Sequence, residues 1–316
     1  KETCNMEIFL TLAKNVLEEG FIYGIMVMGV YITYKILDFP DLSVDGTFPL
    51  GACVAGVFLQ LGSGFTGPLA AIWPWLVCLI AFAAGGLAGC FTGVLHVKLH
   101  ITDLLSGIIT MTALWTVNLL ILGGFQGLSM ITFFDAPTIF KSGLMALLPK
   151  GFAPYRVLLL AFVMALAVKL LMDAFLKTKS GLLLRAAGDN TQYVTALAKN
   201  QGKMKILGLA IGNGCTALAG CVLAQQKGSV SVDMGIGMVV QALAAVIIGT
   251  SIFGRLRNMK PTTMVLLGTL LYKTCLIIAM FLLPSTFLKL TMAALFVAAL
   301  LTDRMGKRRK GGAQNG

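Results

Sequence analysis

Long apolar stretches recur along this chain, with short polar turns between them. A helix that crosses a bilayer needs about 20 predominantly apolar residues, and most of these stretches come close to that length. The pattern predicts about nine membrane segments, at residues 20–37, 47–60, 73–90, 103–122, 155–172, 205–225, 234–252, 261–283 and 287–301. The predicted fold is therefore all-α and polytopic, with residues 1–316 forming one transmembrane domain.

The first residues differ from the later segments. From Met6 to Glu18, apolar residues recur at helical spacing and charged residues occupy the opposite face. This pattern is typical of an amphipathic helix that lies at the membrane interface. We therefore expect residues 1–19 to form an interfacial helix and the first span to begin at Gly20.

The second apolar segment, residues 47–60, is short for a span. Its 14 residues would make a helix of about 21 Å, against a hydrocarbon core of about 30 Å. With Asp45 or Thr47 as its cap and Pro49 in its first turn, it is predicted to be half of a broken helix. The loop before it would then lie partly within the membrane, buried in protein or lining a cavity. If the segment turns back instead of crossing, the N-terminus lies inside the cell; otherwise nine spans place it outside.

An internal repeat accompanies this short segment. Ser43 to Asp45 recur as Ser231 to Asp233, an offset of 188 residues. The same offset superposes a first half, residues 20–122, on a second half, residues 206–302. The connecting loop and single span of residues 123–176 lie between them. An odd number of crossings between two halves makes them inverted, as in many transporters that handle substrate near the midplane.

Polar residues near the repeat are the candidates for a translocation path or gate. Three carboxylates, Asp38, Asp41 and Asp45, fall within eight residues, and helix capping or turn formation accounts for only one or two of them. The complete set of path candidates is Asp38, Asp41, Asp45, Thr47, Asn213, Asp233 and Gln241. Lys273 also lies inside a predicted span. Its ammonium group either snorkels to the membrane interface or has a functional role in the bundle, and in both cases Tyr272 and Thr274 are nearby candidate partners.

Residues 177–205 form a polar island among the apolar segments. Six basic residues stand against one acidic residue, Asp189, so the island is predicted to lie in the cytoplasm. Ser180 is the predicted cap of a short helix that runs through Arg185 and ends at Gly188; a second helix then runs from Asp189 or Asn190 to Gly202. The tail of residues 303–316 is predicted to be cytoplasmic too.

The island is either a solvated loop or a docking surface. The run Leu182 to Leu184 is too apolar for a helix that meets only water, which favours docking to a partner. On the opposite side, residues 123–154 make a long non-cytoplasmic stretch with an expected interfacial helix near Lys141 to Leu148. A soluble receptor is a candidate partner for that stretch.

Composition narrows the class further. The chain is 57% hydrophobic and 12% charged, with a net charge of +12 and a mean hydropathy of +0.88. The basic residues lie at span ends and in the tail. The positive charge is therefore explained by membrane topology and by contact with anionic lipid, and it does not indicate nucleic-acid binding. Six cysteines fall in apolar segments without a paired spacing, and no disulfide framework is predicted.

Two further patterns bear on packing and chemistry. Gly85, Gly89 and Gly93 recur every four residues, a stripe that lets helices approach closely. His96 and His100 lack a third and fourth ligand beyond Asp103, so no metal site is predicted. The sequence contains no phosphate-binding loop or nucleophile elbow, and we expect neither a cofactor nor enzymatic activity. Any ATP hydrolysis is therefore expected in a separate partner subunit.

Four stretches together carry a family resemblance. They are ILDFPDLSVDGTFPLGA (Ile36 to Ala52), SGLLLRAAGDN (Ser180 to Asn190), ALAGCVLA (Ala217 to Ala224) and AAVIIGTSIFG (Ala244 to Gly254). Over nearly its whole length the chain resembles the permease subunits of bacterial ABC importers of the branched-chain amino acid and ribose permease superfamily. The DFPDLSVDGTF wording is most similar to a branch that accompanies a substrate-binding lipoprotein and is often assigned to tryptophan or tyrosine.

This resemblance implies a multi-pass protein of the bacterial cytoplasmic membrane that works with three partners. They are an ABC ATPase subunit, an extracytoplasmic binding lipoprotein and a second permease copy, in a homodimer or heterodimer. It also implies that the island is the coupling element on the ATPase. The expected coupling residues are Ser180, Leu183, Arg185, Asp189 and Asn190. The alternative is an ion-coupled secondary transporter that acts without an ATPase, with Asp41 or Asp45 as its coupling site.

Overall fold

The computed structural model describes residues 2–65, 67–126, 128–141, 155–189, 201–254, 259–282 and 284–312. Its helices are α1 (Glu2–Val30), α2 (Val44–Leu61), α3 (Pro68–Leu99), α4 (Asp103–Gly123), α5 (Arg156–Phe175), α6 (Lys179–Asp189), α8 (Gln201–Lys227), α9 (Met238–Phe253), α10 (Pro261–Leu282) and α11 (Leu288–Gly312). Short helical turns are η1 (Tyr31–Ile36), η2 (Gly62–Gly64), η3 (Gly124–Gln126), η6 (Val232–Gly235) and η7 (Ser285–Phe287). Two strands, β1 (Met130–Thr132) and β2 (Ser229–Ser231), pair antiparallel.

The helical membrane fold predicted from the apolar pattern is confirmed. Within the described residues, eight helical segments are long and apolar enough to cross a membrane. The ninth predicted segment corresponds to the apolar part of α11, Leu288–Leu301, which is shorter than a full span. The predicted interfacial helix near Lys141 to Leu148 lies outside the described residues.

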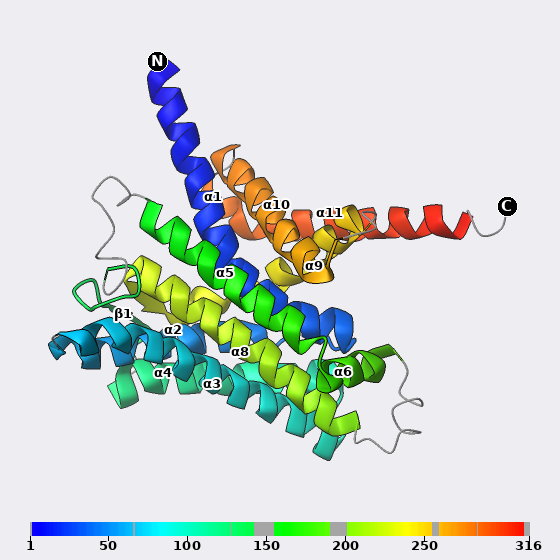
Figure 1. Cartoon of the computed structure of the whole chain (residues 1–316), viewed down its shortest axis with the longest axis horizontal. Coiled ribbons are helices and arrows are strands. Elements are labelled where there is room, and N and C mark those ends of the chain that lie inside the picture. The colour runs from blue at the N-terminus through cyan, green and yellow to red at the C-terminus, as the bar shows by residue number, and fades with distance from the viewer. Residues whose placement is uncertain are drawn as a thin grey trace.

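The N-terminal helix is longer than the sequence pattern predicts. α1 runs without a break from Glu2 to Val30 and continues into the π-helical turn η1, so the boundary expected near Gly20 is absent. Glycine costs a helix interior only about 1 kcal/mol. Here Gly20 lies so close to Leu270 of α10 that a Cβ atom would approach its side chain within 2.6 Å. The N-terminal end of α1 projects away from the other helices (Figure 1), and its interfacial position stays a prediction.

Helix α8 lies at the centre of the bundle and packs against α1, α2 and α3. The predicted glycine stripe of α3 makes the contact with α8. Cβ atoms added at Gly85 and Gly89 would lie 2.5 Å from the Asn213 carbonyl oxygen and 2.2 Å from the Leu209 carbonyl oxygen. The prediction of close helix packing is therefore confirmed, because any larger side chain would push α3 away from α8.

Replacing Gly89 by alanine is expected to lower the midpoint of thermal unfolding by several degrees, since overpacking a helix contact costs about 1–3 kcal/mol. Gly86 on the same helix is the matched control, because its added Cβ would meet only the Ala210 carbonyl oxygen, at 3.6 Å. Thermal unfolding of both variants in detergent measures the difference. Equal midpoints for Gly89→Ala and Gly86→Ala would contradict the close α3–α8 contact.

The two halves of the chain repeat the same packing. α2 contacts α3 and α4, and correspondingly α9 contacts α10 and α11. α3 packs on α8 of the other half, just as α10 packs on α1. The repeat predicted from the offset of 188 residues is therefore present in the helix packing, with α5 between the halves. Figure 1 shows the β1 strand at one end of α5 and α8 and α6 at the other; we call these the strand end and the island end.

Candidate translocation site and coupling surface

The loop between η1 and α2 folds back into the bundle. Asp41 is buried and accepts hydrogen bonds from Nδ2 of Asn213 at 2.6 Å and from the backbone N–H of Ser43 at 2.8 Å. The Ser43 hydroxyl in turn donates to Oδ1 of Asn213 at 3.1 Å. Asn213 lies near the middle of α8, which spans 27 residues. The structure thus brings two predicted path residues, Asp41 and Asn213, together at mid-depth in the bundle.

Helix α4 gives an independent measure of the same depth. Nδ2 of Asn118 donates to the Gly46 carbonyl at 3.1 Å, and Gly46 also lies against Met111 and Leu114. These residues belong to the middle and second half of α4, so α2 begins deep within the bundle. Its other end reaches β1, where Nε2 of Gln60 donates to the Thr132 carbonyl at 3.1 Å.

The short segment predicted at residues 47–60 is therefore longer than expected. α2 has 18 residues because it begins at Val44, before the proline. By length it is a candidate span. Its buried starting point beside the centres of α4 and α8 supports the predicted broken helix with an intramembrane loop.

Asp45 caps a different helix from the one expected. Its Oδ1 accepts the backbone N–H of Val239 at 2.7 Å, and its Oδ2 accepts the backbone N–H of Gly237 at 3.1 Å. The carboxylate therefore holds the N-terminus of α9, where free backbone N–H groups and the helix dipole favour a negative charge. The sequence-based choice of Asp45 or Thr47 as the cap of α2 is wrong, because the helix begins at Val44 and both residues lie inside it.

The segment that leads into α9 lies directly against α2. Gly235 is so close to the Asp45 carbonyl oxygen that a Cβ atom would not fit between them. From this junction, α9 runs toward the island end, where Gly249 packs on Met264 near the start of α10. α2 runs toward the strand end. The two helices thus begin at one mid-depth junction and leave it in opposite directions, as an inverted repeat requires.

The remaining path candidates are more dispersed. Thr47 is buried, and its hydroxyl donates to the Ser43 carbonyl at 2.9 Å, a bond within its own helix. Gln241 is buried one turn into α9, and its Nε2 has no hydrogen-bond partner among the described residues. The side chains of Asp38 and Asp233 are exposed.

The island helix α6 differs from its prediction at both ends. Thr178 rather than Ser180 caps it, since the Thr178 hydroxyl accepts the backbone N–H of Gly181 at 3.2 Å. Gly188 does not end the helix, which continues to Asp189. Gly188 instead allows contact with the Ile36 carbonyl oxygen, where a Cβ atom would not fit. Gly202, the predicted end of a second helix, lies inside α8.

The faces of α6 separate its predicted coupling residues. Leu184 and Ala187 are buried against the bundle, whereas Leu182 and Arg185 are exposed. Ser180 and Leu183 are half-buried. The side chain of Asp189 and all of Asn190 lie outside the described residues.

Comparison with known proteins identifies the family of this architecture. Residues 12–302 match the family described as the branched-chain amino acid transport system / permease component. The chain belongs to this permease family. It is therefore a multi-pass protein of the bacterial inner membrane, of the kind that serves ABC importers.

Individual relatives span much of the chain. A tyrosine transport system permease protein from Clostridioides difficile (strain R20291) is 40% identical over 292 residues, which cover 92% of this chain and 91% of the relative. An uncharacterized protein from Rickettsia prowazekii (strain Madrid E) is 31% identical over 241 residues, 75% of this chain and 76% of the relative. An autoinducer 2 import system permease protein from Salmonella typhimurium is 30% identical over 215 residues, 66% of this chain and 54% of the relative.

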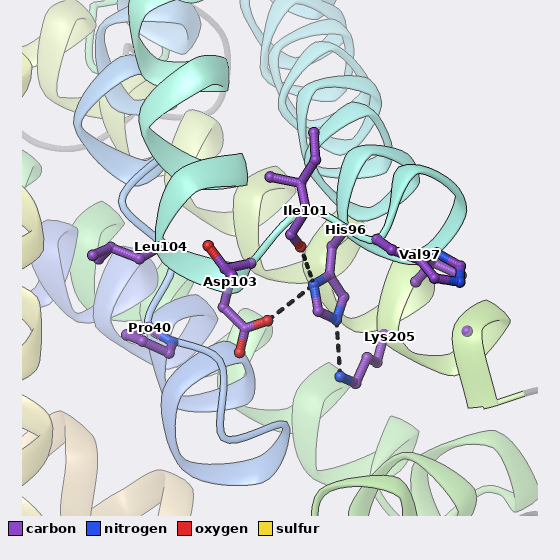
Figure 2. Close-up of a pocket in the computed structure, with 10 residues that line it drawn as sticks. Pro40, His96, Val97, Ile101, Asp103, Leu104 and Lys205 are labelled. Carbon is purple, nitrogen blue, oxygen red and sulfur yellow. Dashed lines mark hydrogen bonds and ion pairs between the residues drawn. The ribbon is translucent and has the colours of Figure 1, made fainter.

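At the island end, the permease carries a histidine that joins several elements (Figure 2). Nδ1 of His96 lies 2.9 Å from both Oδ1 of Asp103 and the Ile101 carbonyl, and its Nε2 lies 3.0 Å from Nζ of Lys205. The ring also contacts Phe39 edge-on. His96 thus links α3, α4, α8 and the loop before α2 beside a cavity of about 760 Å³. The described residues contain no group of three or more metal-ligating side chains.

Sequence reasoning missed the partners of Lys273. Its Nζ forms an ion pair with Oε2 of Glu19 at 3.2 Å and lies 3.5 Å from the centre of the Tyr23 ring. Its side chain is only 5% exposed, so it does not snorkel. Neither predicted neighbour is its partner, because the Thr274 hydroxyl donates to the Leu270 carbonyl and the Tyr272 hydroxyl is buried without a partner among the described residues. Glu19 lay in a segment assigned to the interface, which hid the pairing.

Proposed function

We propose that this chain is the permease subunit of an ATP-driven importer of an aromatic amino acid. In this proposal, two permease copies enclose the path, an extracytoplasmic binding lipoprotein delivers the substrate, and a separate ABC ATPase drives the cycle. The observation that carries the proposal is the junction at which α2 and α9 begin, with Asp45 of one half capping the helix of the other. The substrate class rests on the relative named as a tyrosine transport permease.

The junction is a suitable gate because it is polar, buried and shared by both halves. Asp45 joins α2 to α9, while Asp41 and Ser43 join the same loop to α8. If the two halves rock relative to each other, these hydrogen bonds must either break or stay intact while the bonded residues move together. Alternating access in our proposal therefore consists of movement about this junction.

The island helix is placed to transmit force to that junction. α6 packs on η1 through Gly188 and Ile36, and on α8 through Leu184 and Gly208. η1 leads directly into the loop that carries Asp41, and α8 carries Asn213. An ATPase that displaces α6 would thereby shift both partners of the hydrogen-bonded network.

Co-purification tests the partnership. The tagged permease is extracted from its native membrane in mild detergent, and the accompanying proteins are identified by mass spectrometry. Recovery of an ATPase and a lipoprotein is expected, and the lipoprotein is then screened against amino acids by thermal shift. A permease without an ATPase that transports in proteoliposomes on an ion gradient, and that ionophores inhibit, would replace the proposal with the secondary-transporter alternative.

A variant of the coupling helix tests the island contact. Leu183→Asp is expected to reduce ATPase recovery and uptake at least tenfold, because a charge replaces an apolar side chain at the proposed interface. Lys179→Gln on the same helix is the control, since Lys179 is exposed at its first turn and is expected to remain active. Normal coupling in Leu183→Asp protein of unchanged thermal stability would contradict the role of this face.

A further inference from the structure

A basic cleft opens at the island end, where α5, α6 and α10 meet. The cavity has a volume of about 320 Å³ and is lined by Asp173, Leu176, Lys177, Leu182, Arg185, Lys260, Pro261 and Thr262. Three of these side chains are cationic and one is acidic. We refer to this group as the basic cleft.

The single carboxylate of the basic cleft does not neutralise it. Asp173 already pairs with Lys169 at 3.5 Å and with Lys260 at 3.1 Å, and it accepts a hydrogen bond from the Thr262 hydroxyl. Lys177 and Arg185 form no ion pair with any residue that the structure describes. The cleft therefore carries surplus positive charge, which favours an anionic ligand.

The position of the basic cleft points to a lipid. α5 ends at Phe175 and α10 begins at Pro261, and both helices are candidate spans, so the cleft lies at the boundary between apolar helix surface and water. Phe162 and Leu166 lie on the same face of α5 as Asp173, at helical spacing. They are 45% and 37% exposed. Lys169 lies between Leu166 and Asp173 on this face and pairs with Asp173. Phe162 and Leu166 therefore form an apolar strip on the membrane side of that ion pair.

We propose that the basic cleft binds the phosphate headgroup of an anionic membrane phospholipid. Lys177, Arg185 and Lys260 surround the phosphate, and an acyl chain lies along Phe162 and Leu166. An acidic segment of a soluble partner would satisfy the cations but leave the strip uncovered, since such a segment does not enter the hydrocarbon layer. A bound lipid would bridge α6 to α5 and α10 at the island end.

Native mass spectrometry tests this site with phosphatidylglycerol and with phosphatidylcholine of the same acyl chains. The full-length permease is titrated with each lipid, and bound copies are counted. The wild-type protein is expected to retain phosphatidylglycerol preferentially. Lys177→Gln/Lys260→Gln is expected to reduce that occupancy about tenfold or more, because each basic residue near a surface adds appreciably to anionic lipid binding. Arg185 is left unchanged because it also belongs to the proposed ATPase contact.

Two controls make the result specific. Lys35→Gln/Lys98→Gln removes the same charge from exposed positions outside the cleft and is expected to bind lipid normally, while Lys177→Arg/Lys260→Arg is expected to retain binding. Equal loss in the outside pair, or equal retention of both lipids, would overturn the site. If inorganic phosphate alone protects the permease against thermal unfolding, the cleft binds a free anion. If an acidic ATPase segment cross-links to the cleft, the cleft binds the protein partner. Either result would overturn the lipid proposal. Lipid binding is read without an ATPase, so it is independent of the coupling proposal.

Discussion

Replacing Asp45 by alanine is expected to reduce substrate uptake more than tenfold at normal expression. Its carboxylate accepts two backbone N–H groups at the start of α9, and no other described side chain accepts them. Loss of a charged cap at this half-buried position leaves those donors unpaired, at a cost of about 1–3 kcal/mol. Because this bond joins the two halves, the cost falls on the junction that must move during transport.

The repeat supplies the control for this prediction. Asp233 occupies the corresponding position in the second half but is exposed. Its backbone N–H donates to the Ser231 hydroxyl and its carbonyl accepts the N–H of Ile236, while its carboxylate bonds to no residue that the structure describes. The uptake rate of Asp233→Ala is therefore expected to lie within about twofold of the wild-type rate, because surface substitutions of this kind change stability little. Uptake assays on membranes with matched permease content compare the two variants. Wild-type uptake by Asp45→Ala would remove the junction from the proposed mechanism.

Replacing Lys273 by methionine is expected to destabilise the permease by about 3 kcal/mol, at the lower end of the range for breaking a buried ion pair. Glu19 would be left without its cation, although its 32% exposure allows partial solvation. The cation–π contact with Tyr23 would also be lost. Thermal unfolding in detergent measures the change, with Lys227→Met at an exposed position of α8 as the control.

A double variant distinguishes the ion pair from simple loss of packing. Glu19→Gln/Lys273→Met removes both charges, so it is expected to be more stable than Lys273→Met alone. If the double variant loses the full sum of the two single effects, the charges do not interact and the assigned pair is wrong.

The apolar pattern predicted much of the architecture because membrane helices must satisfy their own backbone hydrogen bonds. Segment boundaries were less accurate. Gly20, Gly188 and Gly202 were interpreted as helix ends or boundaries, but each lies inside a helix. Gly20 and Gly188 are there because a neighbour approaches closely. A glycine selected for a tertiary contact and one selected for a helix end are identical in the sequence.

The sequence predicted which residues belong to the site better than it predicted which residues they bond to. Asp41, Asp45 and Asn213 were selected as polar residues near the internal repeat, the two carboxylates because capping and turns do not explain all three in that loop, and the structure places these three residues near the α2–α9 junction. Their connections remained hidden, since Asp45 bonds to a helix more than 190 residues further along the chain. The loop and its repeat also selected Asp38 and Asp233, which are exposed.

The amino-acid pattern was enough to predict a multi-span helical membrane protein with two related halves and a basic island between spans. Those features depend on local hydrophobicity, charge and residue spacing, which can be read directly from the sequence. Three features depend on the folded bundle: the helix that Asp45 caps, the pairing of Glu19 with Lys273, and the basic cleft between α5, α6 and α10. Such contacts join residues that are distant in sequence, and they form because buried polar groups and charges must find partners in the folded bundle.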